Sequence, residues 1–311
     1  MTIKKEGAMV IATTTNDFGA VNDYVKRIEY VCEGGFRYVD LCLWAPLRDD
    51  PLFSENWRDH ALMLKSLSEE KGFTFVQAHS PCANSCNGEK GFADAVRKSK
   101  RAIEICGVLE IPNVVVHPGY GKDLVDKDIW FEENRRFYMA LIDDMERCGV
   151  NVLCENNTRA NVPYGYNLFV GKDMREFIDY LEHPMFGGCW DTGHANIGGN
   201  QYDDIIALGN KLYGIHFSDN RGKEDEHTAP FMGTLNVDEV MHALLDVGYK
   251  GVFTFEADSI LRPASYRHGN RHSFAADSRL AEPPLAVKIQ MEKFLFETGK
   301  YILNTYGLYE E

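Results

Sequence analysis

Short runs of β-branched and aromatic residues alternate with longer segments of helical periodicity along the whole chain of 311 residues. This alternation is typical of repeated β-strand and α-helix units, in which each helix carries the chain back so that the next strand lies parallel to the last. We predict eight strands, over residues 9–14, 36–41, 73–79, 112–117, 150–155, 186–191, 212–217 and 251–256. The pattern therefore predicts an α/β fold with a parallel sheet.

The segments between these runs place apolar residues at helical spacing. They predict helices over residues 59–71, 92–106, 130–148, 172–181 and 237–247, with a last helix over about 286–306. Four glycines each follow a helical segment and precede a strand, as a glycine just beyond a helix end does: Gly72, Gly107, Gly149 and Gly248. These helix ends strengthen the prediction of repeated units.

Eight units without a composition break or a linker predict one (β/α)8 TIM barrel of a single domain over residues 1–311. It includes the loop after the eighth strand, 257–284, and the C-terminal helix. The length would also suit two domains, but α/β barrels reach this size as one. A doubly wound open sheet is the alternative, and its usual G-x-G-x-x-G turn after the first strand is missing.

Composition restricts the classes of partner. The formal net charge of -14 repels polyanions at long range and disfavours a nucleic acid partner, although salt screens that field over about 10 Å. No apolar run approaches the roughly 18 residues of a membrane span, and the first run is too short for a secretory signal. The eight cysteines form no C-x-x-C pair and indicate a reducing compartment. We therefore expect a cytoplasmic protein.

Polar side chains stand at or near the ends of six consecutive predicted strands. They are His79, His117, Glu155, Asp191, His216 and Glu256. Any one of them would more often anchor a loop through hydrogen bonds than bind a metal. A barrel, however, brings its strand ends together at one mouth, where long loops also gather and active sites form. Carboxylates and imidazoles without thiolate suit Mn²⁺, Mg²⁺, Co²⁺, Fe²⁺ or Zn²⁺.

The runs HPGY, LCENN, CWDTGHAN, HFSDN, DEH and FEAD, in this order and spacing, resemble the xylose isomerase-like TIM-barrel superfamily. The resemblance extends from about His79 to Glu256. The superfamily includes sugar isomerases and epimerases as well as endonuclease IV, so the resemblance is specific for the superfamily and less specific for the reaction.

The isomerase and epimerase members imply one divalent cation, held by residues that match Glu155, Asp191, His216 and Glu256. In these members the two glutamates are also the acid and the base that move a proton beside the sugar carbonyl. The matching His194 contacts substrate. A cation makes such a proton removable by stabilising the enediolate oxygen. Which glutamate acts as base stays open.

Endonuclease IV implies a different site, with three zinc ions and phosphodiester cleavage. Its ligands match His79, His117, Glu155, Asp191, His194, His216, Asp225, His227 and Glu256. Several family motifs are altered here: E-N-T-A-G becomes ENNTR, and L-E-T-P becomes FEAD. The segment after the second strand, LWAPLRDDPLFSENW, carries more acid than base and would grip a phosphate backbone poorly.

Other side chains are candidates for substrate contacts. Trp44, with Phe53, Tyr120 and Tyr164, can pack a ring on the apolar face of a sugar. Arg221, in HFSDNRG, matches a substrate-binding arginine of some epimerases. The run YRHGNRH, 266–272, is the densest basic segment and could hold a phosphate.

Together these observations predict a metal-dependent isomerase or epimerase of a small sugar or sugar phosphate. Glu155 and Glu256 are the catalytic candidates, one Mn²⁺, Zn²⁺, Co²⁺ or Mg²⁺ ion is the expected cofactor, and up to three ions are allowed by the ligands present. A trinuclear zinc endonuclease is the alternative. The sequence leaves open the sugar, its phosphorylation and any homo-oligomer.

Overall fold

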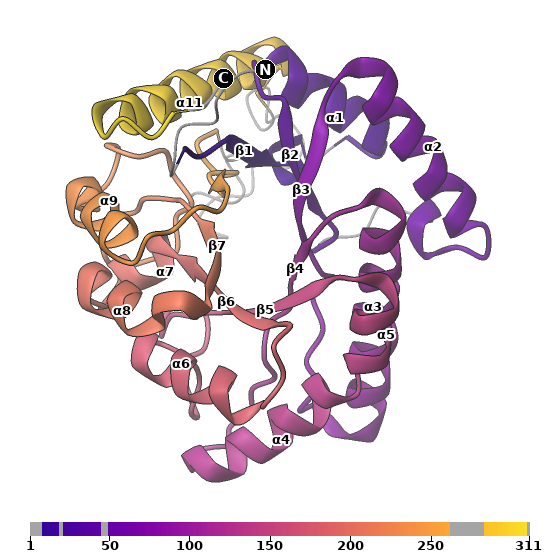
Figure 1. Ribbon diagram of the computed structural model, residues 1–311, viewed down its shortest axis with the longest axis vertical. Helices are drawn as coiled ribbons and strands as arrows, with labels where there is room; N and C mark the ends of the chain where they lie inside the picture. Colours follow the sequence, from indigo (N-terminus) through magenta and orange to yellow (C-terminus); the bar gives the residue numbers. More distant parts are fainter. Residues whose placement is uncertain (1–7, 19–20, 45–48, 262–282, 310–311) are drawn as a thin grey trace, which may run out of the picture.

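The chain folds into one closed barrel of eight parallel strands surrounded by helices, as the sequence predicts (Figure 1). The computed structural model describes residues 8–18, 21–44, 49–261 and 283–309. Neighbouring strands pair in parallel in the order β7-β6-β5-β4-β3-β2-β1-β8. The ring closes between β7 and β8, where the Phe217 amide donates to the Thr254 carbonyl at 2.7 Å and the Glu256 amide donates to the Phe217 carbonyl.

Each predicted strand is present, although several are shorter than their apolar runs. The strands are β1 Ile11–Thr14, β2 Tyr38–Cys42, β3 Thr74–His79, β4 Asn113–Val115, β5 Asn151–Glu155, β6 Phe186–Asp191, β7 Leu212–His216 and β8 Phe253–Phe255. His79, Glu155, Asp191 and His216 are the last residues of their strands. His117 and Glu256 follow just beyond β4 and β8, so all six side chains are at the same end of the barrel.

The helices form the outer layer in Figure 1. They are α1 Tyr24–Glu33, α2 Trp57–Lys71, α3 Gly88–Leu109, α4 Lys127–Met139, α5 Ile142–Cys148, α6 Gly171–Tyr180, α7 Thr192–Asn196, α8 Gln201–Leu208, α9 Val237–Asp246 and α11 Leu285–Thr305, with short 3-10 turns η1 Thr15–Phe18, η2 Pro51–Phe53 and η3 Gly209–Lys211. None of the helices in the described ranges is long and apolar enough to cross a membrane.

Two details of the predicted helices are wrong. The single helix expected over 130–148 is divided into α4 and α5 at residues 140–141, because apolar periodicity continues through a break in the backbone hydrogen bonding. Gly107 does not end its helix, since α3 continues to Leu109 and Glu110 adopts the left-handed conformation with φ 60°. A side chain at Gly107 would lie 2.9 Å from Cβ of Cys148, so this glycine permits close helix packing.

The core has two parts. The large part lies between the sheet and the helices and is rich in aromatic side chains, with Trp130, Tyr138 and Phe177 packed together. A small apolar cluster of Val115, Leu153 and Cys189 is separate from this main core. The barrel therefore has a packed base beneath the mouth, as small side-chain-filled barrels do.

Candidate metal and substrate site

The strand ends open into a pocket of about 840 Å³. Its lining includes His79, His117, Glu155 and Glu256 from the strand ends, His194 from α7, and Asp225 and His227 from the loop after β7. Asp191 and His216 are buried behind these residues. The barrel thus brings together side chains that are up to 177 positions apart in the chain, from His79 to Glu256.

Four side chains form the innermost cluster. Glu155, Asp191, His216 and Glu256 offer ligand atoms that all lie within 4.8 Å of one another. Nδ1 of His216 lies 2.8 Å from Oε1 of Glu155 and 3.1 Å from Oε2 of Glu256. The two glutamates, from opposite sides of β6 and β7, therefore converge on one imidazole nitrogen.

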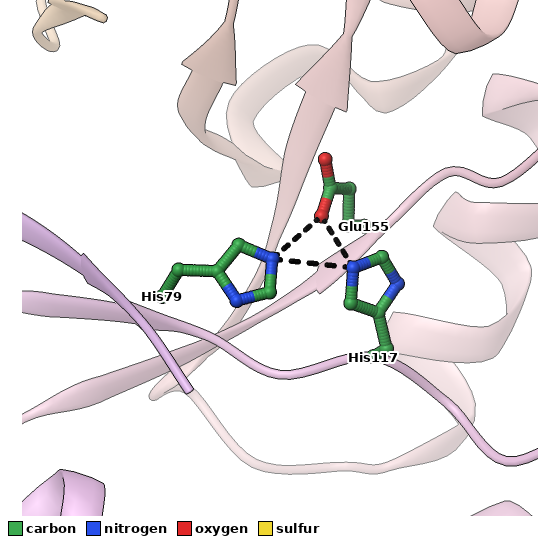
Figure 2. Close-up of side chains that lie close together, drawn as sticks. All are labelled: His79, His117 and Glu155. Carbon is green, nitrogen blue, oxygen red and sulfur yellow. Dashed lines mark hydrogen bonds and ion pairs between the residues drawn. The ribbon is translucent and has the colours of Figure 1, made fainter. Parts of the chain in front are cut away.

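A second cluster shares Glu155 with the first (Figure 2). The other carboxylate oxygen of Glu155, Oε2, lies 3.4 Å from Nε2 of His79 and 3.0 Å from Nε2 of His117. The two histidine Nε2 atoms are 3.2 Å apart. Figure 2 shows all three side chains pointing toward one another, with His79 and Glu155 at the ends of β3 and β5 and His117 just beyond β4.

A third cluster lies at the side of the pocket formed by the β6 and β7 loops. Oδ2 of Asp225 lies 3.2 Å from Nε2 of His194 and 2.9 Å from Nε2 of His227. Nδ1 of His194 lies 2.8 Å from the carbonyl oxygen of Asn156, which leaves Nε2 for the pocket side. The local fold orients this histidine, because Asp191 caps α7 by accepting from the His194 amide at 2.6 Å.

Burial and neighbouring charges shift the pKa values of the carboxyl groups of this site in different directions. Burial raises the pKa of Asp191 to about 7. Burial also acts on Glu155 and Glu256, but the adjacent His216 outweighs it, with His117 adding to the effect at Glu155. The pKa of Glu256 falls to about 2, and that of Glu155 falls well below its usual range. Both glutamates are therefore held as carboxylates.

The histidines respond to the same charges in the opposite direction. Burial lowers the pKa of His194, but Asp191 and Asp225 together raise it to about 10. His117 differs, because burial dominates and lowers its pKa. Without a bound cation, protonated imidazoles thus balance the negative charge of the carboxylates at the mouth. A bound cation would take over that role.

The residues present fit a divalent cation. Oδ2 of Asp191 is buried and has no hydrogen-bond partner within the described part of the chain, which leaves it available as a ligand. Cys189 lies close enough to join Glu155 and His216. Burial raises the pKa of its thiol to about 12, so the cysteine stays protonated and is a poor ligand. The remaining oxygen and imidazole donors suit Mn²⁺, Co²⁺, Mg²⁺ or Zn²⁺.

The candidate substrate contacts separate into two groups. Trp44 lines the pocket, where its ring packs edge-on against His79 and His117 at centroid distances of 5.0 and 5.1 Å. Tyr120 also lines it. Arg221 does not, because its side chain is 74% exposed and forms an ion pair with Glu226.

Two further candidates, Phe53 and Tyr164, are absent from the pocket lining among the described residues. The basic run over 266–272 lies outside the described residues.

Two buried polar residues beneath the mouth were missed by the sequence reasoning. Asp40 of β2 places Oδ2 3.6 Å from Nε2 of His216, and Nε2 of Gln77 donates to the same oxygen at 2.9 Å. Gly214 makes room for this pair, since a side chain there would lie 2.5 Å from Oε1 of Gln77. The sequence contains a signal for Asp40, because a carboxylate stands in the predicted strand FRYVDL at a position where an apolar residue is usual.

A family model described as xylose isomerase-like TIM barrel matches residues 28–274. The chain belongs to this family. The match confirms the resemblance that the strand-end motifs indicated, and the observed barrel agrees with it.

Among relatives, MJ1311 of Methanocaldococcus jannaschii, a protein of uncharacterised function, is 30% identical over 164 residues, which are 51% of this chain and 55% of that protein. The chain thus spans about half the length of this relative. Inosose isomerase of Halalkalibacterium halodurans is 22% identical over 90% of this chain and 95% of its own.

Solved structures with the same fold include a D-tagatose 3-epimerase-like protein, with 19% identity, a TM-score of 0.70 and coverage of 96% of this chain and 99% of the other. D-psicose 3-epimerase of Clostridium cellulolyticum H10 with D-tagatose has 18% identity, a TM-score of 0.72 and coverage of 95% and 99%. The IolI protein with a zinc atom has 16% identity, a TM-score of 0.72 and coverage of 96% and 99%.

Proposed function

We propose that this protein is a divalent-metal-dependent sugar isomerase or epimerase. The observation that carries the proposal is the pair of glutamates, Glu155 and Glu256, that approach the same nitrogen of His216 and both line the pocket. The names of the inosose isomerase relative and of the sugar epimerases with the same fold support the reaction class.

The metal would be held by Glu155, Asp191, His216 and Glu256. When bound there, a divalent cation polarises a carbonyl or hydroxyl oxygen and so favours loss of a proton from the neighbouring carbon. Asp191 and His216 are buried behind the pocket lining, so they are suited to holding an ion and not to contacting a sugar. The glutamates reach both the ion position and the pocket.

In this proposal one glutamate, as a carboxylate, accepts the proton from the carbon beside the carbonyl, and the other first takes up a proton from solvent and then donates it to the opposite face. Glu155 is fully buried, whereas the Glu256 side chain is 17% exposed. Because their surroundings differ, their proton affinities separate when substrate replaces solvent, which an acid and base pair requires. Return of a proton to the opposite face of the same carbon gives epimerisation. Return to the neighbouring carbon, with transfer of the hydroxyl proton to the former carbonyl oxygen, gives isomerisation.

The sugar itself would be oriented by side chains around this pair. Nε2 of His194 faces the pocket and can bond a hydroxyl, while Trp44 offers a ring at the rim. Trp44 also packs on His79 and His117, so it can close the metal side of the pocket against water.

A trinuclear zinc endonuclease is the competing reading, because the second and third clusters could each hold a further ion. It is not favoured. Lys288 is the sole lysine or arginine among the described residues that line the pocket, which is a poor surface for a nucleic acid backbone.

The decisive experiment combines metal analysis with turnover. Purified protein is loaded with Mn²⁺, Co²⁺ or Zn²⁺ and assayed on D-tagatose, D-fructose and inosose, and on duplex DNA with an abasic site. We expect interconversion of at least one ketose. Glu155→Gln and Glu256→Gln should each lower kcat by about 100-fold or more, the typical contribution of a positioned acid or base.

Glu297→Gln, an exposed carboxyl change on α11, serves as the control and should leave kcat unchanged. Three tightly bound zinc ions together with cleavage of abasic DNA would instead identify the endonuclease.

A further inference from the structure

His227, in the loop after β7, adopts the left-handed backbone conformation with φ 45°. Residues other than glycine are uncommon in this conformation, because their Cβ atom crowds the backbone. It persists only where surrounding contacts hold it, and it is frequent at active sites. His227 lines the same pocket as Glu155 and Glu256. The contacts that hold His227 therefore bear on the proposed site.

Two hydrogen bonds join His227 to the segment just beyond β8. Nδ1 of its ring lies 2.9 Å from the carbonyl oxygen of Glu256. A carbonyl oxygen can only accept, so this nitrogen carries the hydrogen and donates it. The carbonyl oxygen of His227 in turn accepts from the Ser259 amide at 3.1 Å. His227 thus contacts this segment at two points, on either side of its own position.

The rest of the loop after β7 holds the His227 ring in place. Nε2 lies 2.9 Å from Oδ2 of Asp225, so both ring nitrogens have a partner. Next to His227, Thr228 and Asp219 exchange two backbone hydrogen bonds, of 2.9 and 3.0 Å. Asp219 is fully buried. The ring therefore extends from a well-anchored loop.

Glu256 depends on contacts outside the regular sheet. Glu155 is the last residue of β5 and pairs with Cys189 of β6, whereas β8 covers only Phe253–Phe255 and ends before Glu256. The Glu256 amide donates to the Phe217 carbonyl at 3.2 Å, and the Glu256 carbonyl accepts from His227. Because both of its backbone groups are held, the tetrahedral Cα fixes the direction of its side chain.

We propose that His227 is a positioning residue for Glu256, which acts through the hydrogen bond from Nδ1 to the Glu256 carbonyl and orients the carboxylate toward His216. This inference rests on the proposed function, in which Glu256 is a metal ligand and the acid or base. It differs from the role of ligand to a further cation, because it uses Nδ1 and needs no ion at the nitrogen that faces Asp225.

Substitutions can separate the two nitrogens of the ring. The amide nitrogen of Asn is bonded to Cγ, as Nδ1 of His is, and the amide nitrogen of Gln lies one bond further out. His227→Asn therefore keeps a donor for the Glu256 carbonyl, and His227→Gln keeps one for Asp225 instead. His227→Gly has neither donor. Glycine and asparagine both tolerate positive φ, so the comparison of these two variants separates the hydrogen bond from backbone strain.

Binding of Co²⁺ to the full-length protein, measured by calorimetry, tests the proposal without requiring turnover. We expect His227→Gln and His227→Gly to weaken Co²⁺ binding by about 10–100-fold, the typical effect of changing a residue that supports a metal ligand. His227→Asn should retain most of the wild-type affinity. The visible absorption spectrum of bound Co²⁺ should match wild type in His227→Asn and differ in the other two variants. Lys223→Gln, at an exposed position of the same loop, is the control.

The proposal is overturned if His227→Gln and His227→Gly bind Co²⁺ like wild type, or if His227→Asn loses as much affinity as His227→Gly. It is also overturned if every variant binds one cation fewer, since His227 would then be a metal ligand. Should His227→Gly fail to fold, the comparison of His227→Asn with His227→Gln provides the test.

The proposed function fails separately from this role. If Co²⁺ binding follows the expected order but no ketose is converted, the catalytic function fails and the positioning role stands. If a ketose is converted and the variants bind Co²⁺ like wild type, the positioning role fails and the function stands.

Discussion

At the scale of single residues, the most informative contact is the one between His216 and Asp40. One nitrogen of His216 faces the two glutamates, and the other lies 3.6 Å from Asp40, which is itself held by Gln77. Carboxylates behind metal-binding histidines fix the ring orientation and the tautomer, and they make the imidazole a better ligand. If His216 binds the proposed cation, Asp40 is expected to be a positioning residue that acts through it.

Replacement of Asp40 by Asn should weaken metal binding by about 10–100-fold, because the amide keeps the shape of the side chain and removes its charge. Titration with Mn²⁺ or Co²⁺, followed by calorimetry, measures this change. Asp238→Asn, an exposed site on α9, is the control. Unchanged metal affinity in Asp40→Asn would show that His216 does not depend on this carboxylate.

At the scale of elements, α11 closes the side of the barrel next to β1 and places Glu292 against Asp17. Asp17 is half-buried, and burial raises its pKa from the ordinary value of 3.8 to about 7. Burial and the Asp17 charge also raise the pKa of Glu292 well above its usual range. The folded protein thus binds protons here more tightly than the unfolded chain does.

This proton binding makes stability depend on pH in a definite direction. This contribution to the free energy of unfolding is fully present below about pH 4. It is lost as pH rises through about 7, because ionisation of the buried carboxyl destabilises the folded state and not the unfolded chain. Asp17→Asn should therefore flatten the fall in unfolding free energy between pH 4.5 and 8 that wild type shows in urea titrations. A variant with the same slope as wild type would contradict this account.

At the scale of the whole molecule, the proposed metal ligands come from the carboxyl ends of four consecutive strands, β5 to β8. A cation that binds only this folded arrangement stabilises the barrel by mass action, by about 2.7 kcal/mol at a concentration of 100 times Kd. It also relieves the crowding of carboxylates at the mouth.

Removal of metal with a chelator should therefore lower the Tm of the wild-type protein, and added Mn²⁺ or Co²⁺ should restore it. Asp191→Ala should lose most of this metal-dependent increase in Tm, because it removes a buried ligand. The measurement is thermal unfolding followed by circular dichroism, with and without metal. An equal metal-dependent shift in Asp191→Ala would place the ion elsewhere.

The amino-acid sequence by itself determined the barrel, the order of its strands and the side chains at the strand ends. These features are local, because the pattern of a few consecutive residues predicts each strand and helix. Parallel strands then end on the same side of the sheet. His79, Glu155, Asp191 and His216 could be assigned to one mouth for this reason alone.

Only the tertiary structure decided which nitrogen of His216 faces the glutamates, that Asp40 lies behind it, and that Arg221 pairs with Glu226 outside the pocket lining. It also brought Asp17 and Glu292 together, although 275 positions separate them in the chain. Side-chain direction and contacts between distant segments depend on how helices pack around the closed sheet. The periodicity of one helix or strand does not predict that packing.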